Sequence, residues 1–252
     1  MEEWYHYLLL VIVGFVVGFI NTVAGGGSLL VLPFLIFIGL PSNIANGTNR
    51  VAIVVQAALA TSGFKSKGVS TYPFNVYLGI AAFLGSIIGA NIAVDVTGEV
   101  FNRILAIVMV AVVLIIVFGP KMSMVHLEER LTGKYLWLGI IAFFFFGIYG
   151  GFINAGLGFI MMLFLHYVNR MSLVRSNATK VAVVFFYMLS ALAVFAFNDK
   201  VNWKIGLILA IGNGSGAWLA SRVSVTKGDG FIRTFLVVMV LVLAIKLWFF
   251  TT

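Results

Sequence analysis

The feature that most limits what this chain can fold into is a succession of long apolar runs with almost no charge. Eight of these runs are long enough to cross a bilayer, since a helix rises about 1.5 Å per residue and the hydrocarbon core is about 30 Å thick. They cover, approximately, residues 5–23, 44–63, 73–94, 100–118, 135–153, 173–197, 202–221 and 231–249. Two further runs, at about 28–39 and 157–169, are short. The sequence therefore predicts an all-α polytopic membrane protein.

Composition excludes several other classes of protein. The chain is 62% hydrophobic and only 10% charged, whereas soluble domains are about 25% charged. The runs are continuous rather than alternating, which disfavours a β-barrel. The net charge of +8 fits Lys and Arg in cytoplasmic loops better than nucleic-acid binding. Because the chain has no cysteine, thiol catalysis and thiolate metal sites are excluded.

Four segments of the first half of the chain recur, in the same order, in the second half. The repeated pairs are GFIN at 18–21 and 151–154, NGT at 46–48 and NAT at 177–179, GSIIGANIA at 85–93 and GNGSGAWLA at 212–220, and FNRILAIVMV at 101–110 and FIRTFLVVMV at 231–240. Ordered matches of this kind are hard to obtain by chance, and duplication is typical of secondary transporters. The sequence therefore predicts two homologous membrane repeats, at 1–120 and 135–252, joined by a polar linker loop at 121–134.

Loop charges favour an inverted arrangement of these repeats. If both short runs cross the membrane, each repeat has about five helical segments, an odd number, so the two repeats have opposite orientations. The positive-inside rule then puts the N-terminus outside, with most loop Lys and Arg residues cytoplasmic and Asp95, Glu99 and Asp199 on the other side. The exceptions are Arg103 and Lys200. If the short runs are re-entrant instead, each repeat has four crossings.

A glycine-rich break interrupts the first repeat where a helix is otherwise expected. Gly25, Gly26 and Gly27 precede Ser28, and each glycine inside a helix costs about 1 kcal/mol relative to alanine. A helix that starts at such a break offers free backbone N–H groups and a positive dipole end, which suit an anion. The alternative is that the glycines only serve close helix packing. We expect packing at three other pairs: Gly14 and Gly18, Gly85 and Gly89, and Gly212 and Gly216.

Two polar clusters open the third and eighth runs, and each ends in a cation. The first comprises Asn46, Thr48, Asn49 and Arg50, and the second comprises Asn177, Thr179 and Lys180. A cation within a span costs about 2.5 kcal/mol or more, so it is functional by default. All of these side chains donate hydrogen bonds, and Arg can hold an oxyanion bidentately. The alternative is that Arg50 and Lys180 lie near helix ends and reach the lipid headgroups.

Acidic residues are absent where many transporters need them. No Asp or Glu lies clearly inside a run, so neither a carboxylate proton relay nor a sodium cage is visible. The spans also contain no HExxH motif, no Asp pair and no convincing Ser–His arrangement. We therefore expect neither an enzyme nor a metal site nor a cofactor. Gln56 is a polar residue inside the third run that can hydrogen-bond across helices.

The segments GFINTVAGGGSLLVLPFL and IANGTNRVA together resemble the TauE/SafE family of sulfite exporters and related permeases. The resemblance extends over the length of the chain, its duplication and both motif pairs. The second repeat departs from the glycine pattern, with Ala155-Gly156-Leu157-Gly158 where a fuller cluster is expected. The resemblance implies an integral membrane permease for small, often sulfur-containing anions such as sulfite or organosulfonates.

We therefore predict a secondary transporter for a small sulfur oxyanion in the cell membrane, with alternating access between the repeats. The predicted binding residues are Asn21, Gly25, Gly26, Gly27, Ser28, Asn46, Thr48, Asn49, Arg50, Asn154, Asn177, Thr179 and Lys180. The alternative is a passive anion channel with the same donors. The expected partners are the anion and the bilayer, and no nucleic acid. Proton coupling, direction of transport, and a monomer or a homodimer all stay open.

Overall fold

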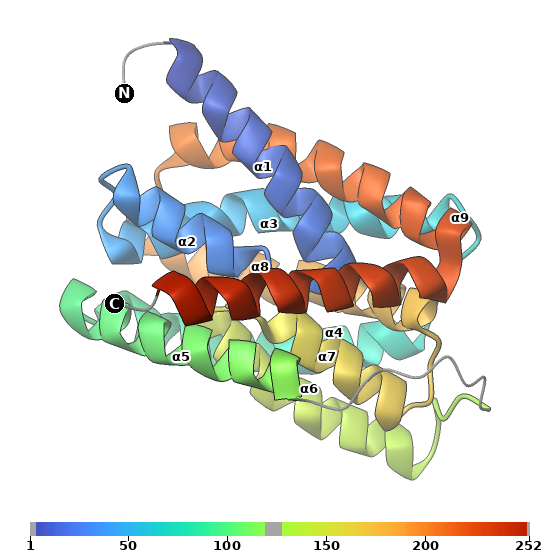
Figure 1. Ribbon diagram of the computed structural model, residues 1–252. Helices are drawn as coiled ribbons and strands as arrows, with labels where there is room; N and C mark the ends of the chain where they lie inside the picture. Colours follow the sequence, from blue (N-terminus) through green and yellow to red (C-terminus); the bar gives the residue numbers. More distant parts are fainter. Residues whose placement is uncertain (1–3, 119–127, 251–252) are drawn as a thin grey trace.

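The structure is a computed structural model that describes residues 4–118 and 128–250 (Figure 1), and all regular secondary structure in these residues is helical. Its helices are α1 (Trp4–Ala24), α2 (Ser28–Phe37), α3 (Ser42–Lys65), α4 (Phe74–Asp95), α5 (Gly98–Phe118), α6 (Lys134–Phe152), α7 (Leu157–Tyr167), α8 (Leu173–Phe197) and α9 (Trp203–Phe250). The all-α prediction is confirmed for the described residues. The bounds of α1 to α8 lie within about two residues of the predicted runs.

Helix α9 consists of two helical segments that meet at a kink, and they correspond to the two predicted runs 202–221 and 231–249. The helix continues past the end of the first apolar run and breaks at Gly228, which has a φ of 70° and a ψ of −168°. Figure 1 shows the chain reversing direction there. The carboxylate of Asp229 accepts hydrogen bonds from the backbone N–H groups of Leu173 and Val174, at 3.0 and 2.9 Å. The kink therefore ties α9 to the beginning of α8.

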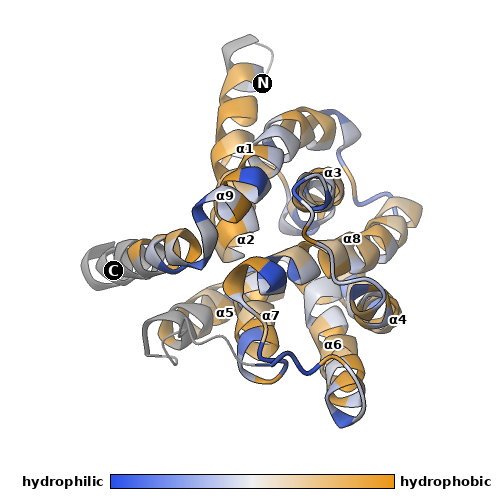
Figure 2. Ribbon diagram, turned by 90° about the vertical axis from the view of Figure 1, so that its right-hand side faces the viewer, coloured by the Kyte–Doolittle hydropathy of each residue, from blue (hydrophilic) through white to orange (hydrophobic). Residues whose placement is uncertain are grey.

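Four helices in the described part of the chain are long and apolar enough to cross a membrane, namely α1, α4, α6 and α8. Helix α3 has 24 residues, but polar side chains and Arg50 occupy its first turns. Helices α2 and α7 have 10 and 11 residues, which is too short to cross about 30 Å of hydrocarbon. Figure 2 shows apolar residues along most of the helical ribbons and hydrophilic residues mainly at helix ends and connections. This pattern is typical of a polytopic membrane protein.

Helix packing follows a reciprocal pattern. Helix α1 lies along the first part of α9, and α6 lies along α4. A Cβ atom on Gly18 would meet the backbone of Asn213, and a Cβ atom on Gly151 would meet the backbone of Ser86. In the repeated motifs, these two pairs occupy corresponding positions. The glycines therefore allow the helix backbones to approach closely, as predicted for the glycine pairs of α1, α4 and α9.

Helices α3 and α8 occupy the centre of this arrangement. They contact each other, and each also packs against one of the reciprocal pairs: α3 against α9 and α8 against α4. Their first turns carry the two polar clusters, so the fold places these clusters in the interior. Arg50 and Lys180 are each only 1% exposed. Neither side chain reaches the surface of the protein, which the headgroup alternative would require.

Candidate functional site

The two helix breaks meet at the centre of the molecule. The first lies between α1 and α2, where Gly25 has a φ of +82°. The second lies between α6 and α7, where Gly156 has a φ of +70°. A Cβ atom on Gly158 would lie 2.6 Å from the Cα atom of Gly25 and 3.1 Å from its carbonyl oxygen. The breaks are therefore in direct backbone contact.

Gly158→Ala is expected to lower the melting temperature of the purified protein by several degrees, because overpacking costs about 1–3 kcal/mol. The added methyl group would press on the backbone of Gly25, which cannot rotate away as a side chain can. Gly26→Ala is the matched control, since its Cβ would have Leu29 Cδ1 as nearest neighbour at 3.9 Å. Thermal denaturation in detergent measures both variants. Equal melting temperatures would contradict the contact between the breaks.

Asn21, from the first GFIN motif, organises the first break. Its side-chain N–H donates to Gln56 Oε1 at 2.9 Å. Its side-chain oxygen accepts a hydrogen bond from the backbone N–H of Gly27 at 3.2 Å. Asn21 thereby connects the end of α1, the start of α2 and the middle of α3.

Asn154, from the second GFIN motif, has the corresponding role in the second break. Its side-chain N–H donates to Ser28 Oγ at 3.2 Å, and its side-chain oxygen accepts from the Tyr187 hydroxyl at 2.6 Å. Asn154 also has a φ of 59°, a left-handed conformation that asparagine tolerates better than most residues. The bond to Ser28 joins the second break to the first.

Gln56 and Tyr187 are site residues that were missing from the predicted set. Each follows the threonine of its polar cluster by eight residues: Thr48 in the first repeat and Thr179 in the second. Each bonds the GFIN asparagine of its own repeat. Their matching positions in the two repeated segments could have identified them, whereas their residue types could not, because Gln and Tyr are chemically unlike.

Lys180 bonds the end of α1. Its Nζ atom donates to the carbonyl oxygens of Thr22, at 2.8 Å, and Asn21, at 3.3 Å, and lies 3.8 Å from Met162 Sδ. A cation beside the last carbonyls of a helix is favoured by the negative end of the dipole. Lys180 makes no ion pair; those in the described residues are Arg103–Glu99 and Arg175–Glu129. The hydrogen-bond partners of this amino group are therefore neutral.

Arg50 bonds the end of α6 in the same manner. Its guanidinium donates to the carbonyl oxygens of Gly150 and Phe152, both at 3.2 Å, and to that of Gly151. The ring of Phe195 covers it at 4.4 Å. Each of the two buried cations therefore caps a helix in the other half of the chain: Lys180 caps α1 and Arg50 caps α6. From the sequence we predicted that Arg50 and Lys180 bind an anion. In the structure, both side chains donate to backbone carbonyl oxygens.

A small cavity of about 10 Å³ lies where the breaks meet. It is lined by residues from both halves of the chain: Asn21, Gly25, Gln56, Asn154, Gly158, Lys180, Val181, Val184 and Tyr187. This volume holds about one water molecule. Four of the predicted binding residues are thus brought together here: Asn21, Gly25, Asn154 and Lys180. A polyatomic anion would require the cavity to widen.

The other predicted residues do not line the cavity. Thr48 Oγ1 accepts from the backbone N–H of Asn202 at 2.9 Å, just before α9. Thr179 Oγ1 lies 2.9 Å from Thr71 Oγ1, just before α4. The two threonines therefore connect α3 to the segment that precedes α9, and α8 to the segment that precedes α4. Asn49 is buried in α3.

Asn46 and Asn177, which correspond in the repeat, have different surroundings. Asn46 donates to the carbonyl of Phe152 at 2.8 Å and accepts from Arg50 at 3.3 Å. Both amide atoms of Asn177 are buried without a hydrogen-bond partner. Of the first break, Gly26 and Gly27 lie next to the cavity-lining Gly25, and Ser28 bonds Asn154.

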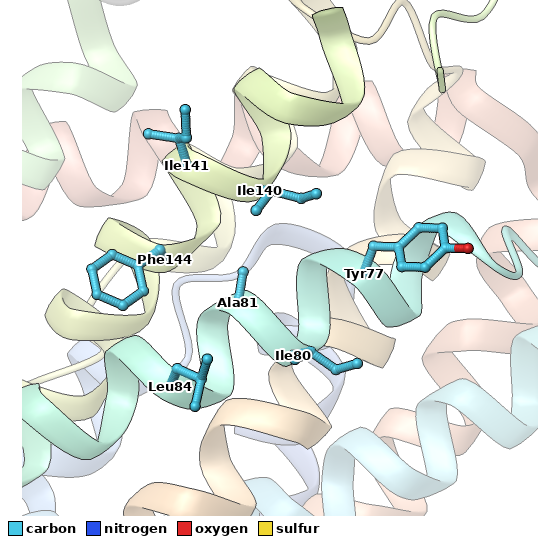
Figure 3. A pocket seen from close by; sticks show the side chains of 7 residues that line it. All are labelled: Tyr77, Ile80, Ala81, Leu84, Ile140, Ile141 and Phe144. Carbon is cyan, nitrogen blue, oxygen red and sulfur yellow. The ribbon is translucent and has the colours of Figure 1, made fainter. Parts of the chain in front are cut away.

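Two larger hollows lie on the outside of the helices. One, of about 430 Å³, is an apolar groove between α4 and α6, lined by Tyr77, Ile80, Ala81, Leu84, Ile140, Ile141 and Phe144; Figure 3 shows these side chains. The other, of about 440 Å³, lies between α3, α4 and α8 and includes Lys65 and Asn75. The first has no charged group, and neither includes a residue of the helix breaks. The central cavity is therefore the better candidate for an anion.

The chain matches the model of the family described as "Sulfite exporter TauE/SafE" over residues 10–247. It is 30% identical over 239 residues to a probable membrane transporter protein of Haemophilus influenzae, covering 95% of this chain and 93% of that protein. It is 28% identical over 249 residues to the probable membrane transporter protein ORF9 of a Sinorhizobium species, covering 98% and 95%. It is also 28% identical over 242 residues to the probable membrane transporter protein YfcA of Escherichia coli K12, covering 95% and 88%. No solved structure matches the chain.

Proposed function

Because this chain belongs to the sulfite exporter TauE/SafE family of membrane transporters, we propose that it is a secondary transporter for a small sulfur-containing oxyanion. Sulfite or an organosulfonate is the proposed substrate, and the cell membrane is the proposed location. The anion would bind at the central cavity between the two helix breaks. Asn21, Gln56, Tyr187 and Lys180 would supply its hydrogen bonds.

The observation that carries this proposal is the buried amino group of Lys180 at the cavity, which has no acidic partner. Its partners are two backbone carbonyls and a sulfur atom, without a carboxylate. A buried charge is costly unless it is paired, and a bound anion would pair it. The starts of α2 and α7 also face this centre, and helix N-termini attract anions. Charge and donors therefore favour an oxyanion over a cation or a neutral solute.

Alternating access between inverted repeats is the proposed mechanism. Two observations support it. Helix α1 packs on α9 as α6 packs on α4, and Lys180 caps α1 as Arg50 caps α6. The cavity holds only about one water molecule in this conformation, so binding and release would each need a movement of one repeat element against the rest. Arg50 would hold α6 in place rather than touch the anion.

Labelled sulfite efflux from proteoliposomes tests the proposal. Efflux is expected to accelerate when unlabelled sulfite is present outside, because a carrier returns faster when it is loaded. Liposomes without protein give the background leak. An internal pH dye in the same experiment reports whether protons accompany the anion. Absence of flux for sulfite and for a series of organosulfonates would overturn the proposed substrate class.

The passive anion channel remains the second candidate, because the same donors would line a pore. The small volume of the cavity, about 10 Å³, favours the carrier, because a pore for a polyatomic anion would need to be wider. A channel would give efflux that external unlabelled sulfite does not stimulate. Trans-stimulation therefore separates the two candidates in one measurement.

A further inference from the structure

A groove of about 440 Å³ lies on the outside of the helices, where α3 and α4 each pack against α8. This volume is within the usual range of small-molecule sites, about 300–1,000 Å³. We call this hollow the α3–α4–α8 groove, and its lining residues differ from those of the central cavity. They are Ala58, Thr61, Ser62 and Lys65 of α3, Asn75 of α4, and Ala182, Phe185 and Phe186 of α8.

Polarity changes along the face of α3 that borders the groove. Ala58, Ser62 and Lys65 are separated by four and three residues, so they share one helix face. This face begins apolar and ends with a charge, because Lys65 is the last residue of α3. The seven residues correspond to about 10 Å along the helix, whereas the hydrocarbon core is about 30 Å thick. The groove therefore belongs to one leaflet of the bilayer, and its polar part lies at a helix end.

The walls formed by α4 and α8 change polarity in the same direction. Asn75 lies in the first turn of α4, which follows the end of α3 after a short connection. One turn further along α4, a Cβ atom on Gly79 would meet the ring of Phe186. Phe186, Phe185 and Ala182 form the apolar wall of the groove. A site with one polar end and one apolar end fits an amphiphile better than a wholly polar or wholly apolar ligand.

The polar end of the groove is basic. Lys65 ends α3, Lys67 follows it in a hydrogen-bonded turn, and both are exposed. Arg222 of α9 adds a third cation in this region, because a Cβ atom on Gly63 would meet its neighbour Ser221. The connection 66–73 contains no acid, and neither ion pair in the described residues includes Lys65. Basic pockets between membrane helices bind anionic lipid headgroups.

Two neutral polar side chains at the same end support a phospholipid. Thr61 Oγ1 and Asn75 Oδ1 are buried and have no hydrogen-bond partner in the described part of the chain. Such atoms are rare in native structures. A hydroxyl and an amide can bond the phosphate, glycerol and ester oxygens that join a headgroup to its acyl chains. The lining therefore offers charge, hydrogen bonds and an apolar wall in the order in which a phospholipid would need them.

We propose that the α3–α4–α8 groove is a binding site for an anionic phospholipid of the bilayer, separate from the site of the transported solute. The phosphate lies beside Lys65 and Ser62, and an acyl chain lies along Ala58, Phe185 and Phe186. The groove between α4 and α6 has a similar volume but no charged lining residue. It can hold an acyl chain without preference for a headgroup.

Native mass spectrometry of the full-length protein in detergent tests the site. The probes are phosphatidylglycerol and phosphatidylcholine with identical acyl chains, titrated separately, and the measurement is the dissociation constant of the first bound lipid. Lys65→Gln is expected to weaken phosphatidylglycerol binding about fivefold, the contribution of one cation near a membrane surface, and to leave phosphatidylcholine binding unchanged. Lys227→Gln is the matched control, because Lys227 is an exposed cation of α9 outside the groove, and it should bind both lipids like the wild type.

Ala58→Trp tests the apolar part, since its indole would occupy the position of the acyl chain, and it should weaken phosphatidylglycerol binding by at least the same factor. Leu84→Trp adds an indole to the groove between α4 and α6 and should leave that binding unchanged. Equal phosphatidylglycerol affinity in Lys65→Gln and the wild type overturns the site, and Lys65→Gln changes only an exposed side chain, so this comparison stands even if Ala58→Trp does not fold. Displacement of the lipid by an equal concentration of soluble glycerol 3-phosphate, or a dimer that is lost in Ala58→Trp and unaffected by lipid, also overturns it.

Discussion

Lys180→Met is expected to reduce saturable sulfite efflux about 100-fold, because losing one partner of a buried charge pair costs about 2–5 kcal/mol. Lys180 is fully buried, borders the cavity and has no carboxylate partner. Methionine keeps the apolar length of the side chain and removes its charge. The anion would then enter a buried site without its only cation. The measurement is the initial efflux rate over a range of sulfite concentrations, with equal protein in each preparation.

Two controls separate the charge of Lys180 from its packing. Lys180→Arg keeps the cation and should retain more transport than Lys180→Met. Lys67→Met makes the same chemical change at an exposed position and should transport like the wild type. If Lys180→Met, eluting as a monodisperse peak, transports within about threefold of the wild type, the site proposed around Lys180 is wrong.

Arg50→Leu is expected to lower the stability of the protein by about 3 kcal/mol or more, since an unpaired buried carbonyl costs about 1–3 kcal/mol. Arg50 satisfies three carbonyls at the end of α6, namely those of Gly150, Gly151 and Phe152. Leucine leaves the carbonyls of Gly150 and Gly151 without this donor in an apolar interior, whereas the carbonyl of Phe152 keeps its hydrogen bond from Asn46. In a chain of this length the melting temperature should fall by about 10 °C, measured by thermal denaturation in detergent.

Arg103→Leu is the matched control for Arg50→Leu. Arg103 lies in an exposed ion pair with Glu99, with its side chain 75% exposed, and such pairs contribute about 0–1 kcal/mol. Its replacement should shift the melting temperature by no more than about 3 °C. Equal shifts in the two variants would show that Arg50 is not needed to hold the end of α6.

The helices and their breaks could be predicted from the sequence because two local signals determine them. Long uncharged runs must be helical in lipid, where every backbone group needs a partner. Gly25 and Gly156 occur where the backbone adopts positive φ, which glycine permits most readily. The helix over the predicted run 202–221 extends a few residues beyond that run. A polar sequence can continue a helix, and this one ends only where Gly228 adopts a non-helical conformation.

The partners of the site residues could not be predicted, because they depend on which helices pack together. The apolar run after Arg50 suggests that the arginine lies within the membrane, where it would contact lipid or a ligand. Nothing in the neighbouring sequence indicates that its partners are carbonyl oxygens of α6, about 100 residues away. Tyr187 has no resemblance to Gln56, although the two side chains bond corresponding asparagines. For Gln56 and Tyr187, the matching position in the repeated segments predicts the shared role, and the residue type does not.

The caps that the two cations place on the opposite repeat have a consequence for biosynthesis. Lys180 follows Thr22, whose carbonyl it caps, by 158 residues. At about 5–20 residues per second, the ribosome needs about 8–30 s to supply that cation. In this interval the end of α1 has carbonyls whose final partner does not yet exist, and unpaired backbone groups in lipid cost several kcal/mol each. The nascent first repeat therefore depends on water or the insertion machinery to shelter this helix end until α8 arrives.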